Sequence, residues 1–409
     1  MTSRKGFVWD TTSRADPGDV SPEASDYENV VDVGVLEDGT FNDVISDLDS
    51  DEVYYYRAFG YDVTLIDSKV WTDGDINAIG NSEIWGIAWS PELGLFSAVG
   101  QNGRAGWSED GKNWIDAGTS MITGTMYDIV WSPELGLFVA VGNDILAYWS
   151  EDGKVWNNST VSVMGAILEG LSWSPELGIF TAVGWNGIVA WSEDGKVWTD
   201  EGTGTINGNV IDVAWSPELG LFSAVGEDGL IAWSEDGKVW TDEGTGMIGG
   251  TMRSISWSPE LGLFVAVGDA GRVAWSEDGK NWTDEGTSMI AESMFGLTWS
   301  PELNIFMSVG IGGGVAWSDD GKNWTDEGLF LFDIFVPNSI SWSPELGLFV
   351  AVGWDGGVAW SEAEILEGEY LYGDELTFTT LENPNNARIT FTTQPSGRFL
   401  EPAIKIRFN

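Results

Sequence analysis

Carboxylates are the first side chains to consider for chemistry, because the 409 residues include no histidine and no cysteine. General acid–base catalysis would therefore depend mainly on Asp and Glu. Most of the 65 acidic residues recur in the repeated phrases SPEL, SEDGK and TDEG, and a repeated acid cannot form one unique active site. Acids that break the repetition could pair as in a glycoside hydrolase; they are Asp128, Asp144, Glu169, Asp212, Glu227 and Asp228. Their spacing selects no pair, so we expect that the protein is not an enzyme.

No metal site is predicted from the remaining acids. Asp47, Asp49 and Asp51 alternate like the ligands of a calcium loop, but the segment lacks the glycine and the distal glutamate of an EF-hand. The same segment lies where a turn is expected in the small β-sandwich predicted below. We therefore expect neither a bound metal nor a cofactor.

The net charge of −47 limits the partners. Phosphate backbones and anionic membrane surfaces would repel such a protein, so we expect neither nucleic-acid binding nor membrane insertion. Acids in every repeat would repel one another at low salt and be screened at high salt. This pattern favours a halophilic source, with an ordinary acidic marine or extracellular protein as the alternative. The first residues show no apolar run typical of a signal peptide, and no segment is long enough to span a membrane.

A phrase of the form WSPELGLFxAVG occurs seven times and organises most of the chain. Successive copies begin 42 residues apart, except for a last step of 43. A repeat of this length, rich in Trp, Val and Gly, predicts an all-β fold in which a seven-bladed β-propeller has one blade per copy. The copies open at Trp89, Trp131, Trp173, Trp215, Trp257, Trp299 and Trp342.

Each predicted blade has four strands, which in the fifth copy fall near residues 254–257, 263–267, 272–275 and 281–283. A serine–aspartate–glycine phrase, SEDGKNW, joins the third strand to the fourth. In it, Ser and Asp oxygens would accept backbone N–H groups of a tight turn, Gly would take a positive φ, and Trp would fill the gap to the next sheet. Six copies are intact, and they begin at Ser108, Ser150, Ser192, Ser234, Ser276 and Ser318.

The seventh blade lacks this phrase, because Trp360 and Ser361 are followed by Glu-Ala-Glu-Ile. The missing part stands before the first repeat, where residues 68–74 read SKVWTDG. We predict that strand 68–72 is the outer strand of the blade at 342–361, which closes the ring and removes its free edge.

The SEDGKNW phrase resembles the Asp box of sialidase-like propellers. This resemblance implies a fold and a turn rather than an activity. A sialidase would also need an arginine triad, a tyrosine nucleophile and a FRIP-like motif. The propeller repeats match this set poorly, since they contain only Arg104, Arg253, Arg272, Tyr127 and Tyr148.

The segments outside the repeats predict a second, split domain. Residues 54–59, YYYRAF, resemble a late strand of a fibronectin type III-like sandwich, and the strand expected next resembles YGDELTFTT at residues 372–380. We therefore predict a propeller inserted into the last hairpin of a small sandwich, with two unrelated β segments as the alternative. The predicted domains are residues 1–66 with 364–380, the propeller at 67–363, and a C-terminal segment at 381–409.

The C-terminal segment departs from the rest in charge. It carries Arg388, Arg398, Lys405 and Arg407 against the single acid Glu401. Its sequence predicts a β-hairpin. This hairpin is either an extra strand pair on the sandwich or a docking element for an acidic assembly partner.

One face of the predicted propeller differs from blade to blade. Loops between strands two and three, and between strand four and the next strand one, vary and share one face, whereas the other two turns are nearly constant. Such a face favours ligand binding, with drift of exposed loops as the alternative. The residue four positions before each WSPE tryptophan differs in every blade: Trp85, Tyr127, Glu169, Ile211, Arg253, Phe295 and Asn338.

Trp85 and Trp354 are expected to meet where blades seven and one adjoin. With Asp355 and Asn81 nearby they would form a sugar platform, in which rings stack on C–H faces and carboxylates accept hydroxyl groups. Packing of one loop on another is the alternative. The remaining candidate ligand-binding residues are Tyr127, Trp185, Arg253 and Phe295.

The repeats also resemble propellers encoded by tailed phages and other large DNA viruses. This resemblance implies a non-enzymatic virion surface protein, a capsid turret, spike or tail fibre, that attaches to host-surface glycan. Expected partners are other virion proteins, further copies of the chain and a host glycan or glycoprotein. The protein would be made in the host cytoplasm without a signal peptide. A purely structural spike and a tail-associated carbohydrate-active enzyme are the alternatives.

Overall fold

The computed structural model divides the chain into two compact units, residues 1–66 with 364–409, and residues 67–363. Among the described residues, no helix combines the length and apolarity needed to cross a membrane. The described residues are 4–10, 29–35, 40–46, 53–62, 65–66, 71–74, 77–143, 147–161, 167–328, 335–362, 364–365, 369–372, 376–379, 386–392 and 407–408.

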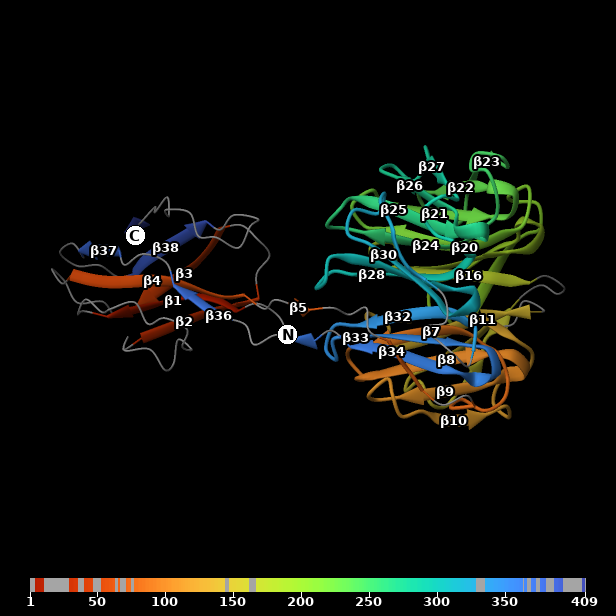
Figure 1. Ribbon diagram of the computed structural model, residues 1–409, viewed down its shortest axis with the longest axis horizontal. Coiled ribbons are helices and arrows are strands. Elements are labelled where there is room, and N and C mark those ends of the chain that lie inside the picture. Colours follow the sequence, from red (N-terminus) through yellow and green to blue (C-terminus); the bar gives the residue numbers. More distant parts are fainter. Residues whose placement is uncertain are drawn as a thin grey trace. The chain divides into compact units, whose positions relative to one another are not determined.

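The second unit is a seven-bladed β-propeller, which confirms the prediction from the repeats. Each blade is an antiparallel sheet, and in blades one to six its four main strands follow one another in chain order from the axis outward, as Figure 1 shows for the central strands and the peripheral ones. Blades one to three contain β7 (Ile84–Ser90), β8 (Leu95–Gly100), β9 (Ala105–Ser108) and β10 (Ile115–Gly118); β11 (Met126–Ser132), β12 (Leu137–Gly142), β13 (Ala147–Ser150) and β14 (Asn157–Asn158); and β16 (Leu168–Ser174), β17 (Ile179–Gly184), β18 (Val189–Ser192) and β19 (Val197–Gly202), which β15 (Thr160–Val161) joins in parallel.

Blades four to six repeat the same order, and blade seven takes its outer strand, β6, from before the first repeat. They contain β20 (Val210–Ser216), β21 (Leu221–Gly226), β22 (Ile231–Ser234) and β23 (Thr241–Gly244); β24 (Met252–Ser258), β25 (Leu263–Gly268), β26 (Val273–Ser276) and β27 (Thr283–Gly286); β28 (Met294–Ser300), β29 (Ile305–Gly310), β30 (Gly314–Ser318) and β31 (Thr325–Gly328); and β32 (Pro337–Ser343), β33 (Leu348–Gly353), β34 (Val358–Glu362) and β6 (Trp71–Asp73).

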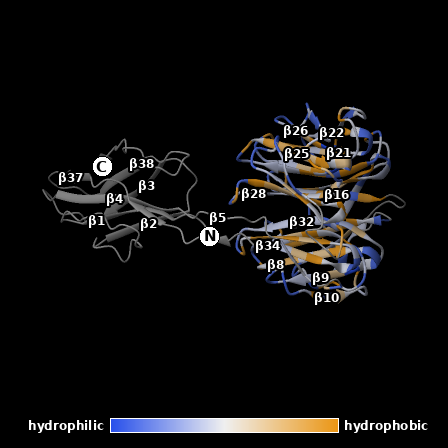
Figure 2. Ribbon diagram, in the orientation of Figure 1, coloured by the Kyte–Doolittle hydropathy of each residue, from blue (hydrophilic) through white to orange (hydrophobic). Residues whose placement is uncertain are grey.

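The hydrophobic core lies between neighbouring blades. Second strands are buried along their whole length, and the phenylalanine of each, such as Phe180, is fully buried. Its ring contacts Trp173 of the first strand and Trp198 of the fourth, at centroid distances of 4.4 and 6.3 Å. Figure 2 shows apolar residues along the strands of the blades, among them the buried second strands such as β8, β21 and β25. Repetition of this aromatic packing explains why most of the tryptophans are framework residues.

The loop between strands two and three contains a single 3₁₀ turn. The third residue of this turn must be glycine: Gly187 has a φ of 62°, and a Cβ there would lie 1.6 Å from the carbonyl oxygen of Ile206. The loop is thereby held against the segment that leads into the next blade. Six such turns are described, η2 (Gln101–Gly103), η4 (Trp185–Gly187), η5 (Glu227–Gly229), η6 (Asp269–Gly271), η7 (Ile311–Gly313) and η8 (Trp354–Gly356).

The SEDGK turns have the predicted hydrogen bonds. In blade three, Asp194 accepts the backbone N–H groups of Lys196 and Val197, each at 2.8 Å, and the Ser192 hydroxyl lies 3.2 Å from the same carboxylate. Trp198 is buried and donates its indole N–H to the carbonyl of Gly195 at 3.2 Å. These hydrogen bonds to the ionised form lower the pKa of Asp194, although partial burial opposes them.

A ring of tryptophan–glutamate hydrogen bonds links all seven blades. The WSPE tryptophan of each blade donates its indole N–H to the WSPE glutamate of the preceding blade, at 2.7–2.8 Å. The ring closes through Trp89 of blade one and Glu345 of blade seven, at 2.7 Å. The WSPE phrase is therefore a connector between blades as well as a turn.

Replacing Glu345 with alanine is expected to lower the free energy of unfolding of the propeller by about 1 kcal/mol, because the charge-assisted bond to the buried Trp89 is lost while Glu345 itself is exposed. This corresponds to a drop of about 2–4 °C in Tm, measured by tryptophan fluorescence. The control is Glu235→Ala, which removes a glutamate that is 69% exposed and only forms a surface ion pair with Lys280. Equal Tm values for the two variants would contradict a role of the ring in stability.

The seventh blade is completed by the N-terminal strand, as predicted. β6 pairs antiparallel with β34, with Thr72 opposite Trp360 and Trp71 opposite Ser361. The chain therefore enters and leaves the propeller side by side, at the end of blade seven where the other blades have their SEDGK turn. The opposite end of each blade carries the variable loops.

The described residues of the first unit form two larger sheets. In one sheet β4 (Val53–Asp62) pairs with both β36 (Glu369–Tyr372) and β37 (Leu376–Thr379), so the predicted partner of the YYYRAF strand is found beyond the propeller. The strand order is β2-β1-β4-β36 in this sheet and β3-β38-β39 in the second, while β5 pairs with β35. The remaining strands are β1 (Arg4–Asp10), β2 (Asn29–Val35), β3 (Thr40–Ser46), β5 (Leu65–Ile66), β35 (Glu364–Ile365), β38 (Asn386–Thr392) and β39 (Arg407–Phe408).

The C-terminal segment contributes strands to this unit. β38 pairs with β3 along seven residues and with β39 on its other side, where Arg388 stands opposite Arg407. Arg398 and Lys405 lie outside the described residues, as does the acidic segment at residues 47–51.

Candidate functional site

The first strands of all seven blades enclose a cavity of 490 Å³ on the propeller axis. The strands begin at the variable face, so the residue four positions before each WSPE tryptophan forms the outer layer of the cavity wall. Below it lies a layer that includes Asp128, Asp212 and Ser254, and the floor is aliphatic. The outer layer contains Trp85, Tyr127, Glu169, Ile211, Arg253, Phe295 and Asn338, with Trp354 added from η8.

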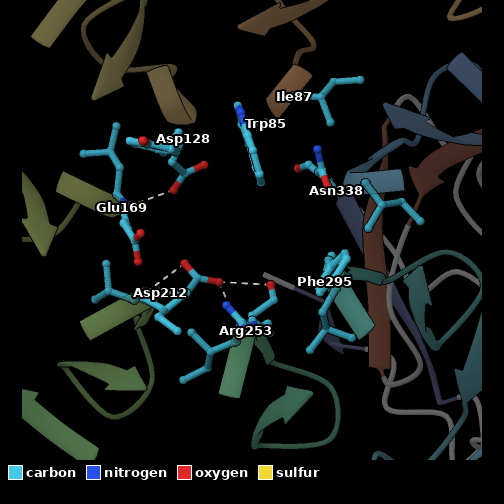
Figure 3. A pocket seen from close by; sticks show the side chains of 18 of the residues that line it. Trp85, Ile87, Asp128, Glu169, Asp212, Arg253, Phe295 and Asn338 are labelled. Carbon is cyan, nitrogen blue, oxygen red and sulfur yellow. Dashed lines mark hydrogen bonds between the residues drawn. The ribbon is translucent and has the colours of Figure 1, made fainter. Parts of the chain in front are cut away.

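Two aspartates in the second layer connect blades across the cavity wall. Asp128 accepts the backbone N–H of Leu171 in the next blade at 2.8 Å and that of its neighbour Ile129 at 2.7 Å. Asp212 does the same two blades later, accepting Ile255 N–H at 2.9 Å. It also accepts the Ser254 hydroxyl at 3.0 Å, a bond drawn in Figure 3. Both oxygens of each carboxylate are therefore engaged by the fold.

Burial raises the pKa of both aspartates. The pKa of Asp212 rises to about 6, although hydrogen bonds from Ile255, Val213 and Ser254 oppose the shift. The pKa of Asp128 is raised well above its ordinary value, first by burial and then by the negative charge of Asp212. The cavity wall thus holds negative charge in a poorly solvated place.

Glu169 adds a third carboxylate to the cavity, and Figure 3 shows it on the same side as Asp128 and Asp212. One of its oxygens accepts the indole N–H of Trp185 at 2.6 Å. Burial and then the charge of Glu227 raise its pKa, while the Trp185 bond and Arg253 oppose them. Tyr127 lines the same cavity, where burial and then the charge of Glu169 raise the pKa of its phenol.

Arg253 is the one basic residue among the described residues that line the cavity. Its guanidinium forms a two-point ion pair with Asp269 of η6, at 2.9 and 3.0 Å. This hydrogen-bonded pair raises the pKa of Arg253. Because Asp269 already balances the guanidinium, the three cavity carboxylates are left largely uncompensated.

The aromatic residues occupy one arc of the outer layer. Trp85 meets Tyr127 edge to face, with ring centroids 5.9 Å apart. Trp354 is 47% exposed and lines the cavity from blade seven, next to blade one. The ring contact found for Trp85 is thus with Tyr127, although Trp85 and Trp354 do share one cavity. Phe295 lines the cavity from blade six.

Two other predicted residues lie outside the cavity wall. Trp185 is 42% exposed in η4 and reaches the site only through its bond to Glu169. Asp355 lies in η8 with a φ of 53°, and its backbone carbonyl accepts the N–H of Asn77. Asn81, expected beside the platform, accepts a hydrogen bond from Arg104 at 3.3 Å.

Sequence reasoning missed the second layer as a unit. The sequence indicates Asp128 and Asp212 as irregular acids, but not as two residues that share the position three residues before the WSPE tryptophan. That position otherwise holds only Gly or Ser, which is the signal that singles them out. Asp144, from the same set of acids, lies outside the described residues.

No group of three or more acidic, histidine or cysteine side chains that could hold a metal ion is found in the described part of the chain. The residues that line the cavity can form hydrogen bonds, stack aromatic rings on a ligand and attract positive charge.

Acidification is expected to stabilise the propeller between pH 7 and about pH 4 and to destabilise it below that. The raised pKa values of Asp128 and Asp212 mean that the folded state binds more protons than the unfolded one in this window, so stability is lost as pH rises through about 6. Below pH 4, SEDGK aspartates such as Asp110, whose pKa is lowered to about 2, reverse the trend.

The variant Asp212→Asn isolates this contribution. It should flatten the pH dependence of the free energy of unfolding, measured by urea denaturation between pH 5 and 7. The slope should change by up to about 1.4 kcal/mol per pH unit, the value for one full proton. Glu193→Gln, which removes a carboxylate that is 69% exposed, should leave the slope unchanged. An unaltered slope in Asp212→Asn would show that this carboxylate is ionised throughout.

Comparisons with known proteins identify the fold but no family. No family model matches the chain, and no curated protein matches it. Among solved structures, one described as YCF48 bound to D1 peptide is 15% identical with a TM-score of 0.57, covering 74% of this chain and all of that chain. A structure of the mitotic checkpoint complex is 13% identical with a TM-score of 0.54, covering 78% of this chain and 98% of that one. At these identities the likeness concerns the fold alone.

Proposed function

We propose that this protein is a non-enzymatic binding protein whose propeller attaches to a carbohydrate on a host-cell surface through the axial cavity. One observation carries the proposal. At a single position of an otherwise repeated scaffold, seven different side chains converge on one cavity of 490 Å³. A structural ring alone has no need for such variety at equivalent positions.

The composition of the cavity suits a sugar. Trp85, Tyr127 and Trp354 lie in consecutive blades and offer ring faces and edges for C–H groups. Glu169 and Asn338 provide hydrogen-bonding groups for hydroxyls in the same layer. The volume is in the range of small-ligand sites, so it accommodates a short part of a glycan rather than a folded protein.

The hydrogen bonding favours binding over catalysis. A general acid or base needs an oxygen that can reach the substrate. Asp128 and Asp212 direct both of their oxygens to backbone N–H groups or to a serine hydroxyl. Glu169 therefore offers the one cavity carboxylate oxygen that no described residue occupies, and hydrolysis of a glycosidic bond uses two carboxylates.

The setting that we propose is the surface of a virion, as a capsid turret, spike or tail fibre. The chain joins the propeller through β6 and β34, at the end of blade seven opposite the variable loops. A fibronectin type III-like base, formed by the first unit, would contact other virion proteins. Arg388, Arg398, Lys405 and Arg407 would help it to dock, and copies of the chain would associate there.

A peptide is the second candidate ligand. It is favoured by the likeness to the solved propeller of YCF48, which is bound to a D1 peptide. The two candidates place the ligand in different chemical classes, so one binding screen separates them.

The test is a glycan array probed with the full-length protein, followed by calorimetric titration of each hit. Binding to defined glycans, competed by the free sugar, is expected. Binding to no glycan would refute the proposal and leave a peptide-binding protein or a structural decoration protein. Turnover of host surface polysaccharide would instead show a carbohydrate-active enzyme.

A further inference from the structure

We infer that the axial cavity selects a sugar that carries a protonated amine, an amino sugar with a free ammonium group, over neutral, N-acetylated or acidic sugars. This inference rests on the proposed function and specifies its ligand. It follows from the charge of the cavity wall, from the place of Glu169 in it and from the adjoining aromatic arc.

The described residues of the cavity wall include three carboxyl groups and one cation, which is already paired. Asp128, Glu169 and Asp212 line it, while Arg253 is bound at two points to Asp269. A ligand anion would meet three carboxyl groups and no free cation, whereas a ligand cation would favour the ionised forms of these groups. An acidic sugar, such as a sialic acid, is therefore disfavoured.

The electrostatics of the site agree with this charge balance. Burial raises the pKa of all three carboxyl groups, and neighbouring negative charge adds to the effect at Asp128 and Glu169. A bound ammonium group would offset these effects and favour the ionised carboxylates, because it supplies positive charge where water is excluded.

Glu169 is the residue placed to accept the ammonium group. Its Oε1 accepts the indole N–H of Trp185 at 2.6 Å, which fixes the carboxylate. Its Oε2 carries no hydrogen bond from the described residues, whereas both oxygens of Asp128 and Asp212 are engaged. Asp128 and Asp212 would therefore act through their charge and Glu169 through direct contact.

The aromatic arc adjoins this carboxylate. Blade order places Trp354, Trp85, Tyr127 and Glu169 in blades seven, one, two and three, so the rings lead up to the acid. A sugar ring stacked on the arc would bring a ring substituent to Glu169. Aromatic faces also attract cations directly, which adds to the preference for an amine.

The experiment measures binding of three trisaccharides to the full-length protein by calorimetry, at one ionic strength that keeps the protein folded. The probes are β-1,4-linked glucosamine, N-acetylglucosamine and glucose. The glucosamine trimer should bind at least about tenfold more tightly than the other two, as expected for a charge-assisted bond. Glu169→Gln should reduce its affinity by about tenfold and leave the neutral trimers unchanged.

The control is Glu193→Gln, which removes the same charge from the same blade at an exposed position on the constant face. Its binding should match that of the unaltered protein. If Glu169→Gln and Glu193→Gln bind the amine equally well, the attraction is general to the acidic surface and the inference is overturned. The inference also fails, with the proposed function intact, if the neutral trimers bind as tightly as the amine.

A trilysine peptide serves as the fourth probe. If it binds with dependence on Glu169 while no saccharide binds, the cavity recognises a cationic peptide and the proposed glycan function is refuted. If saccharides bind and trilysine does not, the amine is recognised on a sugar ring, as inferred.

Discussion

Replacing Trp85 and Trp354 together with alanine is expected to reduce glycan affinity by about 100-fold while leaving the propeller folded. Both rings line the axial cavity, and Trp354 is 47% exposed. A sugar stacked on them would lose the aromatic anchors of the site, and truncation of such anchors costs about 2 kcal/mol or more. Calorimetric titration with the best glycan from the array measures the change.

Stability should change little, because neither ring belongs to the repeated core. The framework tryptophans contact a second-strand phenylalanine, as Trp89 contacts Phe96 at 4.6 Å, whereas Trp85 contacts Tyr127. The matched control is Ile311→Ala. Ile311 is 40% exposed and begins η7 as Trp354 begins η8, but it does not line the cavity. Unchanged binding by a folded double variant would remove the cavity from the proposed function.

The fold could be predicted because its determinants repeat. Seven copies of one phrase specify seven blades, and the failed turn after Ser361 together with the matching segment at 71–74 specifies which strand closes the ring. Each of these features is local, since it depends on residues that are neighbours in one strand or turn. The hydrogen bonds between blades are harder to predict, because their partners are far apart in the sequence. The pairing of Trp89 with Glu345 joins residues 256 positions apart.

For the site, the sequence predicts which positions form the outer layer of the cavity, but not the contacts of each side chain. The comparison of blades identified the outer layer of the cavity, because residues at equivalent repeat positions must form a ring around the axis. It did not identify what each side chain does there. Asp128 turns its carboxylate toward Leu171 of the next blade, whereas Glu169, one blade later and one position earlier in its repeat, is held by Trp185.

These differences follow from distances across the ring. A first strand approaches its neighbour so closely that a Cβ at Gly170 would lie 2.7 Å from the Cα of Asp212. At such spacing an aspartate side chain is long enough to reach the backbone of the neighbouring first strand. The space between the two strands therefore decides where this layer holds Gly, Ser or Asp. The sequence alone gives no measure of that spacing.

Raising the NaCl concentration from 0.1 M to 1 M is expected to increase the Tm of the propeller by on the order of 10 °C. The chain carries a net charge of −47. Its lysines pair with particular neighbours: Lys238, for example, lies 3.6 Å from the Trp191 ring centroid and forms an ion pair with Glu193. The Debye length falls from about 10 Å to about 3 Å over this range, which weakens repulsion between the remaining acids. Relief of a few kcal/mol then moves Tm by about 2–4 °C per kcal/mol.

Tryptophan fluorescence reports this transition for the propeller, because 24 of the 25 tryptophans, all except Trp9, belong to residues 67–363. NaCl and KCl at equal ionic strength separate the causes. Equal increases indicate screening of the acidic surface, while a response to one cation alone indicates specific binding. Sucrose, which strengthens burial without screening charge, is the control for a general solvent effect. A Tm that stays flat or falls with either salt would show that the acids are balanced locally, and the proposed halophilic source would lose its physical basis.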